Sequence, residues 1–201
     1  MGEKLAGVIL SGGGSTRFGE PKAFAKMNGK AFYQHAADAL SPFTEEILIV
    51  SHPDLKQRFE GETSYPVIQD QEPYAEKGPL SGIYAAMEQC DAQWYFIVAC
   101  DMPYFNSDAA GKLLHHRSKE VQGVIPSSEG RMQPLAAIYH KDTLPHLKNQ
   151  LSSGSFRMME WIERFHVKVV TEDVSGIDKS AFQNINDQKT FVLLKTINDK
   201  A

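Results

Sequence analysis

The sequence predicts an α/β protein in which a mainly parallel sheet is covered by helices on both faces. Two observations carry this prediction. Short apolar segments alternate along the chain with longer segments whose apolar residues recur every three or four positions. A strand, a helix and another strand, repeated in this way, favour parallel pairing with helices packed on either side of the sheet.

The predicted strands are short and largely apolar. They cover residues 5–10, 46–51, 65–69, 94–100, 123–126, 134–139 and 167–171. The strands 123–126 and 134–139, joined through the turn-like stretch SSEGRMQ, predict an antiparallel hairpin. Together with the strand 65–69, this pair is expected to give the sheet a mixed edge. Asn28 and Gly29 predict a separate tight hairpin, because this dipeptide suits two positive φ angles.

The predicted helices lie between many of these strands. Phe32, Ala36 and Leu40 show the expected spacing in the first of them. The helices cover residues 32–40, 80–90, 107–117, 141–151, 155–165 and 188–197. No internal repeat, low-complexity tract or linker interrupts the pattern, and 201 residues fit a domain of ordinary size. We therefore expect a single domain over residues 1–201.

Composition excludes several classes of protein. The chain is 42% hydrophobic and carries a net charge of −4, without the basic footprint of a nucleic-acid-binding protein. Cys90 and Cys100 form no CxxC pair, so neither a disulfide framework nor a cysteine zinc site is indicated. The first apolar run is too short for a signal peptide, and the run 94–100 is far below membrane-spanning length. We expect a cytoplasmic protein with no nucleic-acid and no membrane partner.

The loop after the first strand contains three consecutive glycines, Gly12, Gly13 and Gly14, followed by Arg17 and Lys22. It departs from both the dinucleotide fingerprint and the P-loop, since Arg17 takes the place of the third glycine of the former and Lys22 is displaced from its place in the latter. Glycines let the backbone N–H groups approach a ligand closely, and the two cations suit phosphate. A plain flexible turn is the alternative interpretation.

Asp101 follows the apolar strand 94–100 directly. In an open α/β sheet, ligands bind beyond the carboxyl ends of the strands, so Asp101 is expected to face the glycine loop. A carboxylate beside a phosphate site repels the phosphate unless a cation bridges the two groups. Mg²⁺ bridges carboxylate and phosphate oxygens in this way, so we predict that Asp101 binds Mg²⁺. Alone, Asp101 could equally be a turn or cap residue.

Six stretches of the chain form an ordered set of motifs: LSGGGSTRFGEPKA, QD at 69–70, GPLSGI, ACDMP, RMQPLAAIY and NIND. Taken in this order, they resemble the motifs of the molybdenum cofactor guanylyltransferases. The resemblance implies a Rossmann-like three-layer nucleotidyltransferase fold with a mostly parallel mixed sheet. It implies transfer of GMP from GTP to the phosphate of molybdopterin, with Mg²⁺ as cofactor, release of pyrophosphate and transient contacts with other cofactor-biosynthesis or molybdoenzyme proteins.

The resemblance also implies site residues. Arg17, Lys22 and Asp101 would be catalytic, and Asp101 would bind both GTP and Mg²⁺. The GTP-binding residues would be Leu10, Ser11, Gly12, Gly13, Gly14, Lys22, Asp70 and Asp101. The molybdopterin-binding residues would be Arg131, Gln133, Arg157, Asn184 and Asn186. Without the resemblance, the arginines would be interpreted as solvated surface groups and Asn186 as a helix cap.

Two positions depart from the family pattern. Ser11 stands where the family often has alanine, which changes little. His52 and Pro53 follow the second strand, at a position where the resemblance matches no base-contacting residue.

The expected chemistry requires no serine, cysteine or histidine nucleophile, because the attacking phosphate oxygen is already anionic. Catalysis would then consist of positioning and charge neutralisation. Three alternatives stay open at this stage. They are transfer of CMP to molybdopterin, transfer to a sugar or alcohol phosphate, and a nucleotide-binding regulatory module without turnover.

Overall fold

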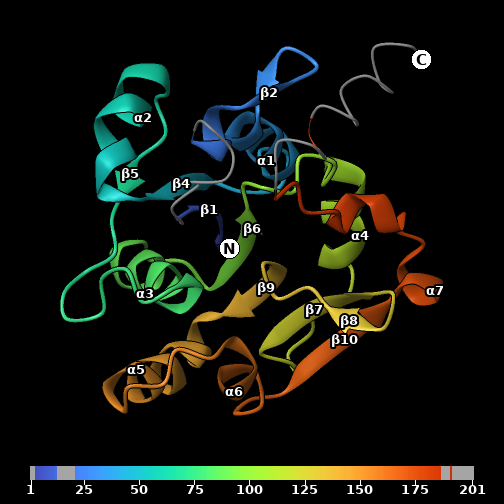
Figure 1. The fold of residues 1–201 in the computed structure, drawn as a ribbon. Helices are drawn as coiled ribbons and strands as arrows, with labels where there is room; N and C mark the ends of the chain where they lie inside the picture. Colours follow the sequence, from blue (N-terminus) through green and yellow to red (C-terminus); the bar gives the residue numbers. More distant parts are fainter. Residues whose placement is uncertain (1–2, 13–20, 187–190, 192–201) are drawn as a thin grey trace.

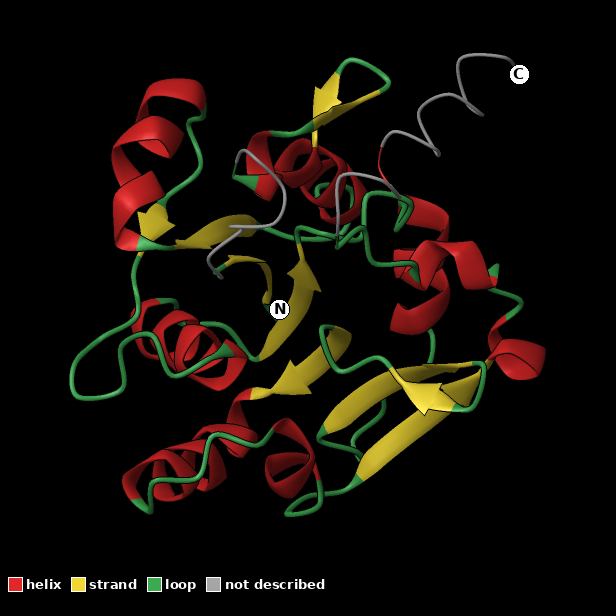
Figure 2. Ribbon diagram, viewed as in Figure 1, coloured by secondary structure: helices red, strands yellow, loops and turns green. Residues whose placement is uncertain are grey.

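A computed structural model describes residues 3–12, 21–186 and 191, and it has the α/β architecture that the sequence predicts (Figures 1 and 2). One 8-stranded sheet has the order β10-β7-β9-β6-β1-β4-β5, with β8 paired to β7, within this described part. Its strands are β1 (Leu5–Ser11), β4 (Glu46–Ser51), β5 (Val67–Ile68), β6 (Trp94–Ala99), β7 (Gly123–Ser128), β8 (Arg131–Met132), β9 (Ala136–His140) and β10 (Val167–Thr171). The α-helices are α1 (Phe32–Leu40), α2 (Lys56–Glu62), α3 (Pro79–Gln89), α4 (Ser107–Leu114), α5 (Leu144–Ser152), α6 (Met158–Ile162) and α7 (Glu172–Ser175).

The central strand β1 pairs in parallel with β4 on one side and β6 on the other. Leu10, near the end of β1, is in register with Val50 of β4 and Ala99 of β6. The carboxyl ends of the three strands therefore meet at one edge of the sheet. Strand β5 adds to β4 in parallel, and β10 adds to β7 in parallel. Strand β9 runs antiparallel to both β6 and β7.

Two hydrophobic cores lie on the two faces of the sheet. Side chains of a strand alternate between faces, and in β1 Leu5 and Ile9 enter one core while Ala6, Val8 and Leu10 enter the other. Helices α1, α2 and α4 contribute to the first core, and α3, α5 and α6 to the second. In Figure 1, α1 and α4 accordingly lie on the opposite side of the sheet from α3 and α5. The predicted Rossmann-like three-layer fold is confirmed.

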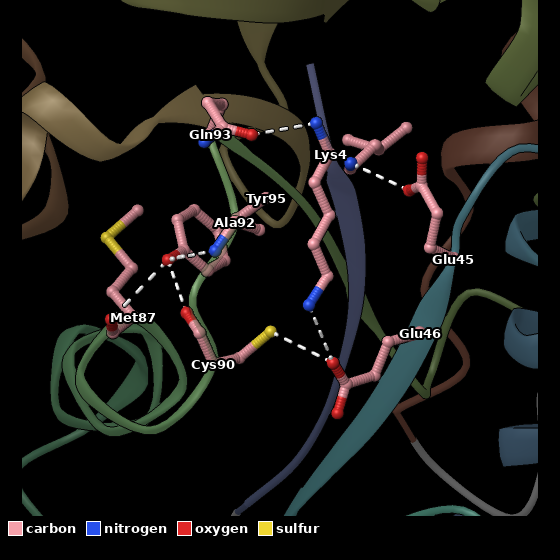
Figure 3. Close-up of polar contacts among 9 residues, drawn as sticks. Lys4, Glu45, Glu46, Met87, Cys90, Ala92, Gln93 and Tyr95 are labelled. Carbon is pink, nitrogen blue, oxygen red and sulfur yellow. Dashed lines mark hydrogen bonds and ion pairs between the residues drawn. The ribbon is translucent and has the colours of Figure 1, made fainter. Parts of the chain in front are cut away.

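Side chains tie the amino end of the sheet together (Figure 3). The Lys4 backbone N–H donates to Gln93 Oε1 at 2.8 Å, and Lys4 Nζ donates to Glu46 Oε2 at 3.2 Å. The Tyr95 hydroxyl donates to the carbonyl oxygen of Cys90 at 2.6 Å. Burial, together with the nearby Glu46, raises the pKa of the Cys90 thiol to about 11. Cys90 is thus a free, protonated core thiol at neutral pH.

Strand pairing differs from the sequence prediction at two points. The 123–126 and 134–139 hairpin is confirmed as the antiparallel pair β7 and β9. The predicted mixed edge is wrong, because β9 lies inside the sheet between β6 and β7, and the strand at 65–69 is a short parallel strand, β5. The pattern of apolar residues indicates that a segment is a strand. The strand with which it pairs is determined by packing across the whole sheet.

Helix boundaries agree best where the apolar spacing is strongest. Helix α1 has the predicted bounds, whereas the predicted helix 155–165 shortens to α6. The predicted helix 141–151 begins with a 3₁₀ turn, Lys141–Thr143, before α5. Helix α2 was not predicted, because it buries a single residue, Phe59, and so shows almost no apolar periodicity. The predicted helix 188–197 lies outside the described residues except for position 191.

The predicted Asn-Gly hairpin is confirmed. It joins β2 (Lys26–Met27) to β3 (Lys30–Ala31), and both Asn28 (φ 52°) and Gly29 (φ 80°) have positive φ. Among the helices that the structure describes, none is long and apolar enough to cross a membrane.

Replacement of Gly7 by alanine is expected to destabilise the protein. A Cβ atom at Gly7 in β1 would lie 3.1 Å from Ile47 Cγ1 and 3.2 Å from Leu40 Cδ1, which is overpacking between the sheet and α1. Overpacking costs about 1–3 kcal/mol. Gly61→Ala is the control, because its Cβ meets nothing within 4 Å and a helical alanine gains about 0.5–1 kcal/mol. Urea unfolding of both variants measures the effect, and a Gly7→Ala variant as stable as the parent would contradict this packing.

Candidate functional site

A pocket of about 810 Å³ opens at the edge where β4, β1 and β6 end. Its walls come from these three strand ends, from the loop after β5 and from the first turn of α3. The sequence-predicted residues Leu10, Ser11, Gly12, Lys22, Asp70 and Asp101 all line it. Gly13, Gly14 and Arg17 lie outside the described residues.

Lys22 stands at one end of this pocket. It begins a 3₁₀ helix, Lys22–Phe24, directly after Pro21, whose fixed φ of −61° sets the direction of the chain. Lys22 Nζ donates to Asn186 Oδ1 at 2.8 Å and lies 3.5 Å from Asp101 Oδ2. The side chain is 18% exposed. The lysine therefore presents a positive charge inside the pocket and not on the open surface.

Asp101 lies two residues past the end of β6, between Cys100 and Met102. Cys100 N–H donates to Leu10 O at 3.0 Å, so the chain still follows β1 when it reaches Asp101. The Asp101 carbonyl accepts a hydrogen bond from Ile185 N–H at 2.9 Å. Burial raises the pKa of the Asp101 carboxyl, and the adjacent Lys22 opposes that rise. The carboxylate is thus held on rigid backbone in a partly desolvated position.

The segment from Asn184 to Asn186 approaches the pocket residue Lys22 and is held in place by a buried residue. Ile185 is fully buried in a small core formed with Ala25, Met27 and Phe32. Asn186, which follows it, contacts Lys22, whereas Asn184 is exposed and does not line the pocket. The structure therefore brings Asn186 to the lysine end of the site.

The opposite end of the pocket is rich in carboxylates. Asp70 follows β5, and its Oδ2 accepts the Glu76 N–H at 3.2 Å. Burial raises the pKa of Asp70. His52 follows β4, and its Nε2 lies 3.1 Å from Glu76 Oε1. Together with Glu72, these side chains surround the pocket near β4 and β5.

The stretch GPLSGI forms the start of α3 and lines the pocket through Gly78, Pro79 and Gly82. Gly78 has φ of 97°, which favours glycine, and Pro79 opens the helix. A Cβ at Gly82 would lie 3.1 Å from Val50 Cγ1 and 3.2 Å from Leu10 Cδ2. Glycine here lets α3 approach the ends of β1 and β4.

The residues expected on the molybdopterin side do not line this pocket. One of them, Asn186, contacts the pocket residue Lys22. Arg131 is exposed on β8, and Gln133 Nε2 donates to its carbonyl at 3.3 Å. Arg157 precedes α6, is 83% exposed and pairs with Glu160 at 3.0 Å. Their predicted role in molybdopterin binding stays a prediction.

The donor set at Asp101 fits a magnesium ion that also binds phosphate. No group of three or more histidine, cysteine or acidic side chains gathers as a metal cage in the described part of the chain. Mg²⁺ is usually held by one or two carboxylates, by water and by substrate phosphates, and a single carboxylate such as that of Asp101 fits this mode of binding.

Several pocket residues were missed by sequence reasoning. Ser51, His52, Glu72, Glu76 and Leu135 all line the pocket. A signal for His52 existed, because it follows a predicted strand whose carboxyl end was expected at this edge. Glu72 and Glu76 lie in a loop with no pattern of its own, and only the tertiary structure brings them here.

Known proteins similar to this chain bear the names of nucleotidyltransferases. Residues 7–169 match the family model of the MobA-like NTP transferase domain. The chain is similar to probable molybdenum cofactor guanylyltransferases from Geobacillus sp. (strain WCH70), at 43% identity covering 94% of this chain and 96% of that protein, and from Bacillus subtilis (strain 168), at 38% identity covering 96% and 95%. The crystal structure of molybdopterin-guanine dinucleotide biosynthesis protein A from Archaeoglobus fulgidus shares the fold, with a TM-score of 0.81 at 22% identity over 98% of this chain and 100% of that one. The pocket at the ends of β1 and β6 thus belongs to a nucleotidyltransferase, and this chain is a member of the MobA-like NTP transferase family alongside the molybdenum cofactor guanylyltransferases.

Proposed function

We propose that this chain, as a single domain over residues 1–201, transfers GMP from GTP to the phosphate of molybdopterin. The products are the molybdopterin guanine dinucleotide cofactor and pyrophosphate. Relatives at 38–43% identity that bear the name molybdenum cofactor guanylyltransferase support this reaction. The observation that carries the proposal is the meeting of Lys22 and Asp101 in one pocket at the carboxyl ends of β1 and β6.

The pocket residues serve an in-line attack of one phosphate on another. The attacking oxygen belongs to the substrate and is already anionic, so no protein nucleophile is required. The obstacle is the repulsion between two anions, which positioned cations and N–H groups reduce. In this proposal Lys22 and Arg17 neutralise charge on the departing pyrophosphate, while Leu10, Ser11 and the three glycines from Gly12 hold the triphosphate. Asp70 helps hold the nucleoside.

Asp101 is the residue that would hold Mg²⁺. When bound there, the ion would polarise the α-phosphate and offset the repulsion between the Asp101 carboxylate and the nucleotide. The position of Asp101 is fixed by two backbone hydrogen bonds. The N–H of the preceding residue, Cys100, donates to the Leu10 carbonyl, and the Asp101 carbonyl accepts the Ile185 N–H.

The molybdopterin phosphate has to approach from outside the nucleotide pocket. Tyr74 OH lies 2.8 Å from Ser152 Oγ, so the end of α5 lies beside the loop that follows β5. Arg157 follows five residues later, which supports its proposed place on the molybdopterin side. Arg131, Gln133, Asn184 and Asn186 are proposed for the same side, together with transient contacts to proteins that deliver or accept the cofactor.

The alternatives that the sequence left open are less well supported. The curated relatives named above bear guanylyltransferase names, which disfavours CMP transfer and a regulatory module without turnover. Transfer to a sugar or alcohol phosphate would keep the same pocket but does not match those names.

The substrate profile tests the proposed function directly. With molybdopterin and Mg²⁺ present, pyrophosphate release is expected to be fastest with GTP among the four ribonucleoside triphosphates. A site built to hydrogen-bond one base leaves buried polar groups unpaired with the wrong one. Omission of molybdopterin is the control. Equal or faster release with CTP would point to the cytidylyl reaction, and release without molybdopterin would point to another acceptor.

Asp101→Asn is expected to reduce turnover by about a hundredfold or more, because the metal contribution is worth several kcal/mol. The residual activity should require more Mg²⁺. Burial raises the pKa of Asp101. At pH values above the ordinary aspartate pKa, the charged carboxylate therefore lowers the free energy of unfolding. The melting temperature at pH 7 should therefore hold or rise. Rates across a magnesium titration provide the measurement. An unchanged magnesium midpoint with a modest loss of rate would make Asp101 a turn residue.

Lys22→Ala is expected to lower turnover by about 100- to 1,000-fold, because a positioned charge that stabilises the transition state is lost. Asn186→Ala should lower turnover by about tenfold. The charge of Lys22 remains in this variant, but the 2.8 Å hydrogen bond that orients it is lost. Gln183→Ala, on an exposed neighbouring residue, is the control and should keep the parent rate. Initial rates at saturating GTP provide the measurement. A normal rate for Lys22→Ala would remove the lysine from the catalytic residues.

A further inference from the structure

The pocket has two ends of opposite character along the edge of the sheet. Lys22 and Asp101 mark the end beside β6, where the glycine loop leaves β1. On the far side of β1 lie the ends of β4 and β5, with His52, Asp70 and Glu76. Of the described lining residues at that far end, several are carboxylates and none is a lysine or an arginine.

This polarity orients a nucleoside triphosphate, whose binding here rests on the proposed function. Phosphate groups avoid unpaired carboxylates, whereas the N–H groups of a base are attracted to them. The triphosphate therefore takes the Lys22 end, and the base takes the end formed by β4 and β5.

His52 and Glu76 place a donor beside an acceptor at that end. The Asp54 backbone N–H donates to His52 Nδ1 at 3.3 Å, which leaves Nε2 as the ring nitrogen that can donate. That Nε2–H faces Glu76 Oε1 at 3.1 Å. The pair thus offers one N–H donor and, next to it, the two acceptor oxygens of a carboxylate.

Guanine presents the complement of this pair. Its Watson–Crick edge carries the O6 acceptor, then the N1–H donor, then the N2 amino donor. We propose that Glu76 is the residue that selects guanine, accepting N1–H and N2–H with its two carboxylate oxygens, and that His52 Nε2–H donates to O6. In this arrangement the contact between His52 and Glu76 is replaced, and both side chains turn toward the base.

The other bases fit this pair less well. Adenine and cytosine place a ring nitrogen lone pair beside their amino group, so the second oxygen of Glu76 would face a lone pair. Uracil offers a single N–H between two carbonyl oxygens, and one of these carbonyls would face the carboxylate. A carboxylate that accepts two N–H groups is therefore specific for guanine.

The backbone of Glu76 supports its assignment over other acids of the same loop. Glu76 has φ of 59°, an unusual conformation for a residue other than glycine. Its N–H is held by the half-buried Asp70, and its side chain is held by His52. Such strain persists where surrounding contacts determine it, and ligand clamps are one such place.

Glu76→Gln tests the proposal, with GTP and ITP as the two ligands. ITP keeps O6 and N1–H but lacks the 2-amino group. The parent protein should bind GTP more tightly than ITP. In the variant, GTP affinity is expected to fall by about 10- to 100-fold and ITP affinity by less, so the ratio of the two affinities narrows. Calorimetric titration with Mg²⁺ measures both ligands without the need for turnover.

His52→Asn provides a second, independent measurement. Asparagine can still accept the Asp54 N–H as a cap but cannot place a donor beside Glu76. GTP and ITP both carry O6, so both affinities should fall by a similar factor of about ten. Asp54→Asn is the matched control, since Asp54 also contacts His52 but is 86% exposed and does not line the pocket. Its affinities for GTP and ITP should equal those of the parent.

Three outcomes would overturn the proposal. They are an unchanged ratio of GTP to ITP affinity in Glu76→Gln, a narrowed ratio in Glu72→Gln instead, and unchanged affinities in His52→Asn. If Glu76→Gln did not fold, the His52→Asn measurement would decide alone. Preference for GTP in the parent together with any of these outcomes would leave the proposed function standing. A parent that prefers CTP would contradict the proposed function itself.

Discussion

The parallel pairing of β1 with β4 and β6 is the constraint on which the rest of this structure depends. All three strands are apolar and buried on both faces, so their backbone groups have to be satisfied within the sheet. Parallel strands in register end at the same edge, and their connections leave that edge as loops. Gly12, His52 and Asp101 consequently line one pocket, although they are far apart along the chain.

The pocket contains charged groups under conditions that destabilise them. Burial raises the pKa values of both Asp70 and Asp101, which means that their charged forms cost free energy in the native state at neutral pH. Asp101 has Lys22 nearby, and Asp70 has the Glu76 N–H. Raised carboxyl pKa values in a cleft are typical of functional sites, where a ligand supplies the missing positive charge or hydrogen-bond donors.

A short segment near the end of the chain completes the lysine end of the pocket. Ile185 packs with Met27 of the β2–β3 hairpin and with Phe32 of α1. Its N–H binds the Asp101 carbonyl, and the next residue, Asn186, binds Lys22. One buried isoleucine therefore joins the hairpin, the end of β6 and the lysine into one unit. Truncation before this segment would remove support from two of the proposed catalytic residues at once.

Local sequence was sufficient for the elements whose stability is local or whose burial is complete. The period of apolar residues predicted β1, β6 and α1, and Asn28-Gly29 predicted its turn, because those patterns follow directly from side-chain geometry and φ preference. The position of Asp101 after an apolar strand predicted its place at the pocket edge for the same reason. Tertiary structure decided what depends on contacts across the chain, namely the insertion of β9 inside the sheet, the short helix α2 with its single buried Phe59, and the meeting of His52 with Glu76. No local signal in the sequence predicts the partners of β9, the helix α2 or the position of Glu76. Each is stabilised by residues that only the folded sheet brings near.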